Sequence, residues 1–168
     1  MIELETRGDV RVLHLCEGEN RFNRGSVDAI HAALDEVVAA QGPVALVTVG
    51  EGKIFSNGLD LDWMGSGGGD DPASCLPEVD LGLPLTPTMY TVLAAHLPAP
   101  ALAEAALTGR RFTGPEAHAL GIVDELAPEA EVLDRAVERA ASLAGKDRKV
   151  IAEHKRLLYP DALPDASD

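Results

Sequence analysis

The sequence predicts an α/β protein whose first third alternates strands with a helix and whose last third is helical. The first observation is an amphipathic helix over residues 27–38 that leads directly into an apolar run over residues 44–49, the order of a right-handed β-α-β unit. The second is the helical spacing of apolar residues beyond residue 130. With 168 residues, the chain has the length of one domain, or of one domain with a small appendage.

The N-terminal elements are predicted from side-chain periodicity. Residues 2–5 and 10–15 alternate apolar with polar side chains on either side of Arg7-Gly8-Asp9, which predicts two short strands joined by a tight turn. The helix that follows is predicted to be capped by Ser26. The β-branched run over residues 44–49 predicts a strand buried on both faces. The apolar stripe of the helix consists of Val27, Ile30, Leu34, Val37 and Val38.

The C-terminal elements are predicted from their end signals. Thr113 and Glu116 have the spacing of a capping box, which predicts a short helix that ends at Gly121. Ile122 and Val123 then predict a brief strand. Two longer helices are predicted over residues 132–144 and from residue 150 onward.

The composition excludes several classes of function. Acidic residues number 28 against 14 basic ones, and the net charge of −14 disfavours a nucleic acid or an anionic membrane as partner. No apolar run approaches the ~20 residues that span a bilayer. No basic-then-apolar leader opens the chain, so a cytoplasmic location is expected. The two cysteines, Cys16 and Cys75, do not predict a disulfide framework.

Metal, phosphate and nucleophile sites are not predicted either. The histidines stand singly, without the paired spacing of metal ligands. The glycine run over residues 65–71 lacks the Lys-Ser/Thr of a P-loop and is interpreted as a flexible loop. No Gly-x-Ser-x-Gly elbow is present, and neither cysteine has an adjacent histidine. The prediction is therefore no metal and no cofactor.

Two segments are unusual. Residues 52–61 follow the predicted buried strand and contain Asp60, a good helix-starting residue. A loop at the carboxyl end of a parallel strand is where such folds bind ligands, although an ordinary strand-to-helix turn has the same pattern. Residues 75–82 place Glu78 and Asp80 among apolar neighbours, where a carboxylate can hold or take a proton. The alternative is a solvent-facing pair on a half-buried strand.

Several motifs in order form a recognisable pattern over most of the chain. They are Glu19-Asn20-Arg21-Phe22-Asn23, Ala45-Leu46-Val47, Phe55-Ser56-Asn57-Gly58-Leu59-Asp60-Leu61, Leu76-Pro77-Glu78-Val79-Asp80-Leu81-Gly82, Thr108-Gly109-Arg110-Arg111-Phe112 and Glu116-Ala117-His118-Ala119-Leu120-Gly121-Ile122-Val123-Asp124. Together they resemble the crotonase superfamily, the enoyl-CoA hydratases and isomerases. The resemblance implies a spiral core of repeated β-β-α units over residues 1–107 and C-terminal helices over residues 108–168 that pack across subunits. It also implies a coenzyme A thioester as substrate and a homo-oligomer, either a trimer or a pair of trimers.

The resemblance further implies site residues. In family members, two backbone N–H groups form an oxyanion hole that stabilises an enolate, and the first donor falls here at Leu59. Glu78 matches the position of the family's proton-shuttling carboxylate. Asp80 is a weaker candidate for tuning or orienting the site, with a structural role as the alternative. The substrate-binding loop residues that the resemblance implies are Phe55, Asn57, Gly58 and Asp60.

The residues around Glu78 look more like the isomerase branch of the family. The resemblance therefore favours conversion of a 3-enoyl-CoA to a 2-enoyl-CoA, in which Glu78 takes a proton from C2 and returns it to C4. Fatty-acid β-oxidation is the family's usual pathway. The alternatives are a 2-enoyl-CoA hydratase, which is a lyase and needs a second acid, and a non-catalytic relative that binds acyl-CoA.

One segment of the family pattern is missing between about residues 65 and 75. Family members carry the second oxyanion donor there, between a strand and a helix. The sequence leaves three explanations: a true deletion, which would expose unpaired strand edges, a spliced or engineered truncation, and a stretch omitted from the sequence. Because coenzyme A is a polyanion, basic residues are expected to soften the acidic field around it. The candidates are Lys53, Arg110, Arg111, Arg148, Lys149, Lys155 and Arg156.

Overall fold

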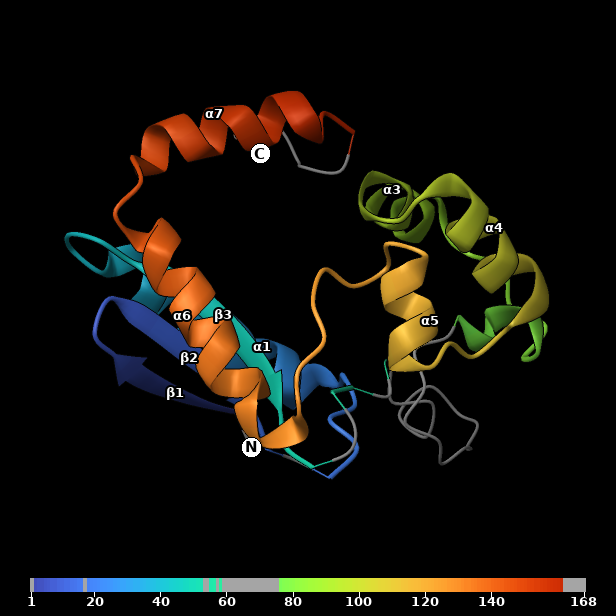
Figure 1. The fold of residues 1–168 in the computed structure, drawn as a ribbon, viewed down its shortest axis with the longest axis horizontal. Coiled ribbons are helices and arrows are strands. Elements are labelled where there is room, and N and C mark those ends of the chain that lie inside the picture. Colours follow the sequence, from blue (N-terminus) through green and yellow to red (C-terminus); the bar gives the residue numbers. More distant parts are fainter. Residues whose placement is uncertain (1, 17, 53–54, 57, 59–75, 162–168) are drawn as a thin grey trace. The chain divides into compact units, whose positions relative to one another are not determined.

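The fold is that of a computed structural model, which describes residues 2–16, 18–52, 55–56, 58 and 76–161 (Figure 1). The chain divides into two compact units. The first comprises Met1–Pro72 and Ala127–Lys146, and the second comprises Ala73–Leu126 and Asp147–Asp168.

The first unit is built on a three-stranded sheet. Its strands are β1 (Ile2–Arg7), β2 (Val10–Leu15) and β3 (Ala45–Gly50), in the order β1-β2-β3. β1 and β2 pair antiparallel around a turn at Gly8, where φ is +62°, so the predicted hairpin is confirmed. β2 and β3 pair parallel, with Leu15 opposite Gly50, which confirms the predicted β-α-β order.

Helix α6 (Val132–Ala144) covers one face of this sheet (Figure 1). Its apolar stripe packs on a cluster formed by Val10, Val12 and Val47, of which the first two are completely buried. The helix ends at Gly145, as predicted. The residues of α6 in this contact are Leu133, Ala136, Val137 and Ala140.

Helix α1 (Arg24–Ala39) contacts β1 and follows the hairpin. The sequence predicted a start near Val27 with Ser26 as the cap, and that assignment is wrong by one turn. Asn23 is the N-cap, because its side-chain oxygen accepts the Ser26 N–H at 3.0 Å. Ser26 is the third helical residue, and its hydroxyl oxygen accepts the Asn23 N–H at 2.9 Å. The two residues therefore form a reciprocal capping box, so the helix extends to Arg24.

The prediction that β3 is buried on both faces is wrong for the structure as described. Val47 is 9% exposed, whereas Leu46 is 36% exposed and Thr48 is exposed. The side chains of a strand alternate between its faces, and α6 covers the face of Val47. The face of Leu46 and Thr48 lacks comparable cover from the described residues, so a β-branched run did not require burial on both sides.

The second unit is helical. The sequence predicted the capping box of α5 (Gly114–Ala119), in which the Glu116 carboxylate accepts the Thr113 N–H at 2.9 Å. It also predicted α7 (Arg148–Leu158). It did not predict α3 (Pro87–His96) or α4 (Ala99–Thr108). Across the part of the chain that the structure describes, no helix combines the length and the apolar character needed to cross a membrane.

The core of the second unit lies where α4 meets α5. Ala105, Phe112 and Ala117 form its buried cluster. Ile122 and Val123 pack against this cluster as bends after α5, so the strand predicted there is wrong. Their backbone instead closes the end of α5, since the Ile122 N–H donates to the Ala117 carbonyl at 2.8 Å.

The capping box of α1 leads to a stability prediction. We expect Asn23→Ala to lower the free energy of unfolding by about 1 kcal/mol, because the Ser26 N–H loses its acceptor at a helix start. Urea unfolding followed by circular dichroism measures the change. Asn23→Asp, which keeps an acceptor oxygen, is the matched control and should cost only a few tenths of a kcal/mol. Equal losses in both variants would contradict the assignment of Asn23 as the cap.

Candidate functional site

The predicted ligand-binding loop is hydrogen-bonded through residues 56 and 58 to residues 20–22, which precede α1. The Phe22 N–H donates to the Gly58 carbonyl at 2.7 Å. The Ser56 hydroxyl donates to the Asn20 carbonyl at 2.7 Å and accepts the Gly58 N–H at 3.0 Å. Two of these bonds connect residues 36 positions apart, and the third lies within the loop. Together they fix the path of the backbone at Gly58, where φ is +72°. A left-handed φ of this size is accessible to glycine without strain.

Asn20 makes two of the hydrogen bonds that hold the loop in place. It is 5% exposed and has a φ of +51°, a left-handed conformation that asparagine tolerates better than most residues. Its side-chain amide donates to the Phe55 carbonyl at 3.1 Å, while its own carbonyl receives the Ser56 hydroxyl. One buried residue thus holds the loop through both its backbone and its side chain. Neither Asn20 nor Ser56 is among the functional residues that the sequence predicts.

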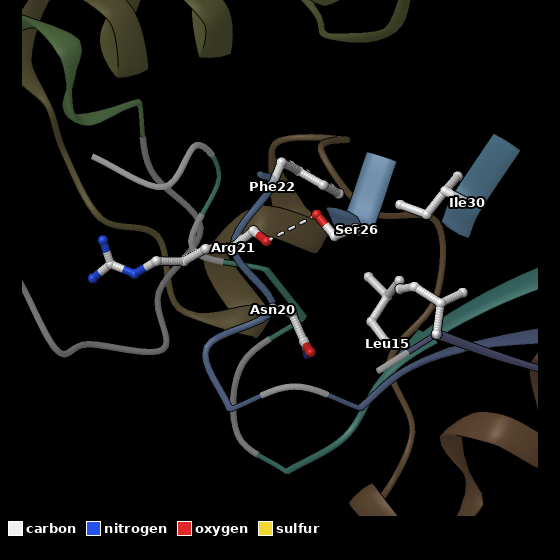
Figure 2. A pocket seen from close by; sticks show the side chains of 7 residues that line it. Leu15, Asn20, Arg21, Phe22, Ser26 and Ile30 are labelled. Atoms are coloured by element: carbon white, nitrogen blue, oxygen red, sulfur yellow. Dashed lines mark hydrogen bonds between the residues drawn. The ribbon is translucent and has the colours of Figure 1, made fainter. Parts of the chain in front are cut away.

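A small pocket lies beside this connection, between the start of α1 and the sheet (Figure 2). The Ser26 hydroxyl donates to the Arg21 carbonyl at 3.2 Å at its edge. Figure 2 shows the Arg21 side chain directed away from Leu15 and Ile30, so the guanidinium is not part of the pocket's apolar wall. The pocket is lined by Ile2, Leu15, Asn20, Arg21, Phe22, Ser26 and Ile30.

The structure describes part of the predicted binding loop. Phe55 is 57% exposed, so it is accessible to a ligand, and Gly58 is held as described above. The predicted oxyanion donor Leu59 lies outside the described residues, as do Asn57 and Asp60. The connection to residues 20–22 therefore ends at the residue immediately before the predicted donor.

Glu78 lies in the second unit, on a short 3₁₀ turn (η1, Pro77–Val79) that contacts α4. The strand weighed as the alternative for this segment does not form. The Glu78 carbonyl accepts the Leu83 N–H at 2.8 Å, which closes a compact loop after the turn. The carboxylate oxygen Oε2 is buried and has no hydrogen-bond partner among the described residues. Such a buried oxygen keeps an unused lone pair, which is unusual in folded proteins.

Asp80 follows on the same turn and packs against the end of α4. Gly109 closes that helix with a φ of +61°. A Cβ placed at Gly109 would lie 2.5 Å from the Asp80 Oδ2 atom, so any larger residue there requires the exposed Asp80 carboxylate to turn away. The contact favours the structural alternative for Asp80 that the sequence left open.

Arg110, a candidate for coenzyme A binding, is already paired with acidic residues. Its guanidinium contacts Glu116 at 2.7 Å and also contacts Glu104. The hydrogen bonds with Glu104 and, to a smaller extent, Glu116 raise the pKa of Arg110. The hydrogen bonds from Thr113 and from Arg110 lower the pKa of Glu116. Two carboxylates offset one cation, so Arg110 contributes little positive field for a phosphate group.

One further group of donor atoms lies in the first unit. A ring nitrogen of His14, the thiol of Cys16 and a carboxylate oxygen of Glu51 all lie within 4.8 Å of one another. The sequence presents His14 as a single histidine without metal-ligand spacing. The signal it lacked was the pairing of β2 with β3, which brings a residue 35 positions later beside Cys16.

Comparison with known proteins gives consistent matches. A family profile described as enoyl-CoA hydratase/isomerase matches residues 68–162. Enoyl-CoA delta isomerase 3 of Arabidopsis thaliana is 30% identical over 223 aligned positions, which cover 96% of this chain and 93% of the relative. The peroxisomal enoyl-CoA delta isomerase 2 of the same plant is 26% identical with the same coverage.

A solved structure matches as well. The crystal structure of a probable enoyl-CoA hydratase from Mycobacterium tuberculosis H37Rv superimposes with a TM-score of 0.84 at 22% identity, over 96% of this chain and 89% of that one. This match confirms the predicted α/β fold class. The alignment with isomerase 3 is 55 positions longer than the 168 residues of this chain, so at least 55 of its positions have no counterpart here.

The loop connection predicts a local effect of Ser56. We expect Ser56→Ala to speed amide hydrogen exchange at Phe22 and Gly58 and to lower the free energy of unfolding by about 1–3 kcal/mol, since a buried carbonyl and an N–H lose their partner. Exchange followed by nuclear magnetic resonance measures this. Ser142→Ala is the control, because that exposed hydroxyl bonds only within α6. Unchanged exchange at Phe22 in Ser56→Ala would rule out the connection.

The contact of Asp80 with Gly109 predicts a difference between two glycines. Gly82→Ala, at a φ of +70° with open space around it, should cost about 1–2 kcal/mol from backbone strain alone. Gly109→Ala should cost about 0.5–1 kcal/mol more, because the new methyl group forces the Asp80 carboxylate out of its present rotamer. Urea unfolding of both variants measures the difference. Adding Asp80→Ala should remove most of the excess, and an excess that persists in the double variant would refute the packing role.

Proposed function

Since the chain belongs to the enoyl-CoA hydratase/isomerase family, we propose that it binds an acyl-CoA thioester and moves a carbon–carbon double bond from C3 to C2 of a 3-enoyl-CoA. The observation that carries the proposal is the buried Oε2 atom of Glu78, which has no partner among the described residues. A base that takes a proton from carbon needs such a lone pair. Two relatives named enoyl-CoA delta isomerase support this choice within the family.

The chemistry assigned to Glu78 is a proton shuttle. The carboxylate takes a proton from C2, and the electrons of that C–H bond move into the thioester, which becomes a dienolate. The electrons then return, a double bond forms between C2 and C3, and C4 takes the proton from the Glu78 carboxylic acid. No water is consumed, so one acid–base group is sufficient, and such groups contribute about 10²–10⁴-fold to rates.

The loop at Gly58 is the proposed site of dienolate stabilisation. The peptide after Gly58 carries the proposed donor, the Leu59 N–H, and the Gly58 carbonyl belongs to that same planar unit. The hydrogen bond from Phe22 to this carbonyl restricts rotation of the peptide. Preorganisation of this kind lets a donor stabilise developing negative charge without reorganising during the reaction. Phe55, Asn57 and Asp60 are the proposed acyl-CoA contacts on the same loop.

A second candidate function is acyl-CoA binding without turnover. The specific observation behind it is the absence of counterparts for at least 55 positions of isomerase 3, since family members place the second oxyanion donor in the segment that the sequence lacks. Losing one donor of an oxyanion hole costs about 10²–10³-fold in rate. A weakened isomerase and a pure binding protein are therefore the two outcomes to separate.

The proposed assembly is a homo-oligomer formed through the C-terminal helices, and the proposed location is the cytoplasm. Support for the assembly comes from α7, where large apolar side chains are exposed in this chain alone: Val150, Ile151, Leu157 and Leu158. Burial of such a stripe against another copy is a general driving force for association.

Ultraviolet absorbance tests the isomerase proposal directly. Mixed with a 3-enoyl-CoA, the protein should produce a new band, because the shifted double bond becomes conjugated with the thioester carbonyl. Glu78→Gln should lower the rate of this change by at least about 100-fold, since the amide cannot accept the C2 proton. Binding of the thioester, measured by calorimetry, should persist in this variant.

The control for this experiment is Glu138→Gln, which changes an exposed acid of α6 and should keep the full rate. A 2-enoyl-CoA that loses its band in the presence of the protein would identify hydration and would refute the isomerase proposal. A flat trace from a protein that binds the thioester would establish the non-catalytic alternative.

A further inference from the structure

The polar cluster of the first unit is positioned by the parallel pairing of β2 and β3. His14 and Cys16 are two residues apart at the end of β2, so their side chains leave the backbone on the same side. Glu51 follows β3 directly, and its N–H donates to the Leu15 carbonyl at 3.0 Å. The carboxyl ends of both strands thus lie at one edge, and three different donor types converge there.

The spacing of these donors suits a metal ion. The sulfur, nitrogen and oxygen atoms already lie within 4.8 Å of one another. Around a tetrahedral zinc ion with bonds of about 2.0–2.3 Å, ligand atoms lie roughly 3.5 Å apart. The donors must therefore approach by at most about 1 Å. The exposed Glu51 side chain can supply most of that movement.

His14 is oriented as a ligand by a carboxylate on β1. Its Nε2 atom donates to the Glu5 Oε2 atom at 2.9 Å, so the lone pair of the neutral ring belongs to Nδ1. A metal-bound histidine almost always donates its other ring N–H to a carboxylate or carbonyl in this way. Arg7 contacts the other oxygen of Glu5 at 2.7 Å and steadies it. The oriented imidazole is the feature that distinguishes this cluster from acidic groups that meet by chance.

We propose that a ring nitrogen of His14, the Cys16 Sγ atom and a Glu51 carboxylate oxygen bind a divalent cation of the zinc class, with water as the fourth ligand. Sulfur, nitrogen and oxygen donors together select zinc or cobalt over magnesium and calcium, which prefer oxygen alone. On binding, Cys16 releases its thiol proton to solvent, and bonds form from the thiolate, the imidazole and the carboxylate to the metal. The ion then links the end of β2 to the end of β3.

The bound cation would stabilise the folded state and would take no part in the isomerase reaction, so the proposal does not depend on the proposed function. In the metal-free protein, burial and the hydrogen bond with Glu51 raise the pKa of the Cys16 thiol, which stays protonated at neutral pH. A cation takes the place of that proton between sulfur and carboxylate. Because the site requires the folded pairing of two strands, metal binding stabilises the folded state over the unfolded chain.

Titration of the chelator-treated full chain with Co²⁺ tests the proposal. We expect saturation at one ion per chain, with a thiolate-to-cobalt charge-transfer band and intense d–d bands of tetrahedral cobalt. Zn²⁺ should then displace the cobalt and raise the melting temperature. Cys16→Ser should lose the charge-transfer band, and Glu51→Gln should lower the affinity at least tenfold. Glu5→Gln should keep the band but weaken binding about 10–100-fold, as expected for a group that orients a ligand.

Two matched controls separate this site from adventitious binding. Cys75→Ser removes the other cysteine and should leave the band unchanged, and His31→Gln removes an exposed histidine of α1 with the same expectation. A band that survives Cys16→Ser, or that disappears in Cys75→Ser, would overturn the proposal, as would no saturable binding by the wild-type chain. If Cys16→Ser unfolds by circular dichroism, the exposed Glu51→Gln variant decides, because an unchanged affinity there also excludes the site.

Discussion

The parallel pairing of β2 with β3 is the constraint on which the first unit depends. A parallel connection needs a crossover, and α1 supplies it between the two strands. The same pairing places Val12 beside Val47 and so creates the buried surface on which α6 packs. It also brings the carboxyl ends of both strands to one edge, where the chain enters the loop containing Ser56 and Gly58. A loss of this register would therefore remove core, helix docking and loop position together.

The two proposed functional features rely on different parts of the polypeptide. The loop at Gly58 relies on backbone geometry, which Asn20 holds from a buried position. Glu78 relies on a side-chain oxygen that the fold buries without a partner. The contacts of the loop use backbone carbonyl groups, which every residue carries, and N–H groups, which every residue except proline carries.

Sequence patterns predicted the elements that local rules specify. The hairpin at Gly8, the capping box at Thr113 and the end of α6 at Gly145 depend on residues close in the chain, and the structure confirms them. The exposure of Leu46 and Thr48 on β3 depends on which element packs against that face, and a local sequence pattern does not predict this. The resemblance to a family placed Glu78 and Leu59 in their roles, whereas Asn20, Ser56 and the cluster at Cys16 required the strand register. The roles of Glu78 and Leu59 stay predictions.

At Glu78, the requirement for a stable fold conflicts with the requirement for the proposed catalysis, because the buried Oε2 atom has no hydrogen-bond partner among the described residues. Burying a carboxylate oxygen without a donor is unfavourable, so an apolar side chain of similar size would suit the turn better than glutamate does. Selection for folding alone would replace this residue early, and only selection for turnover would retain it. Among relatives of this chain, the identity of the residue at this position would therefore record which lineages still depend on catalysis and which have kept only the scaffold.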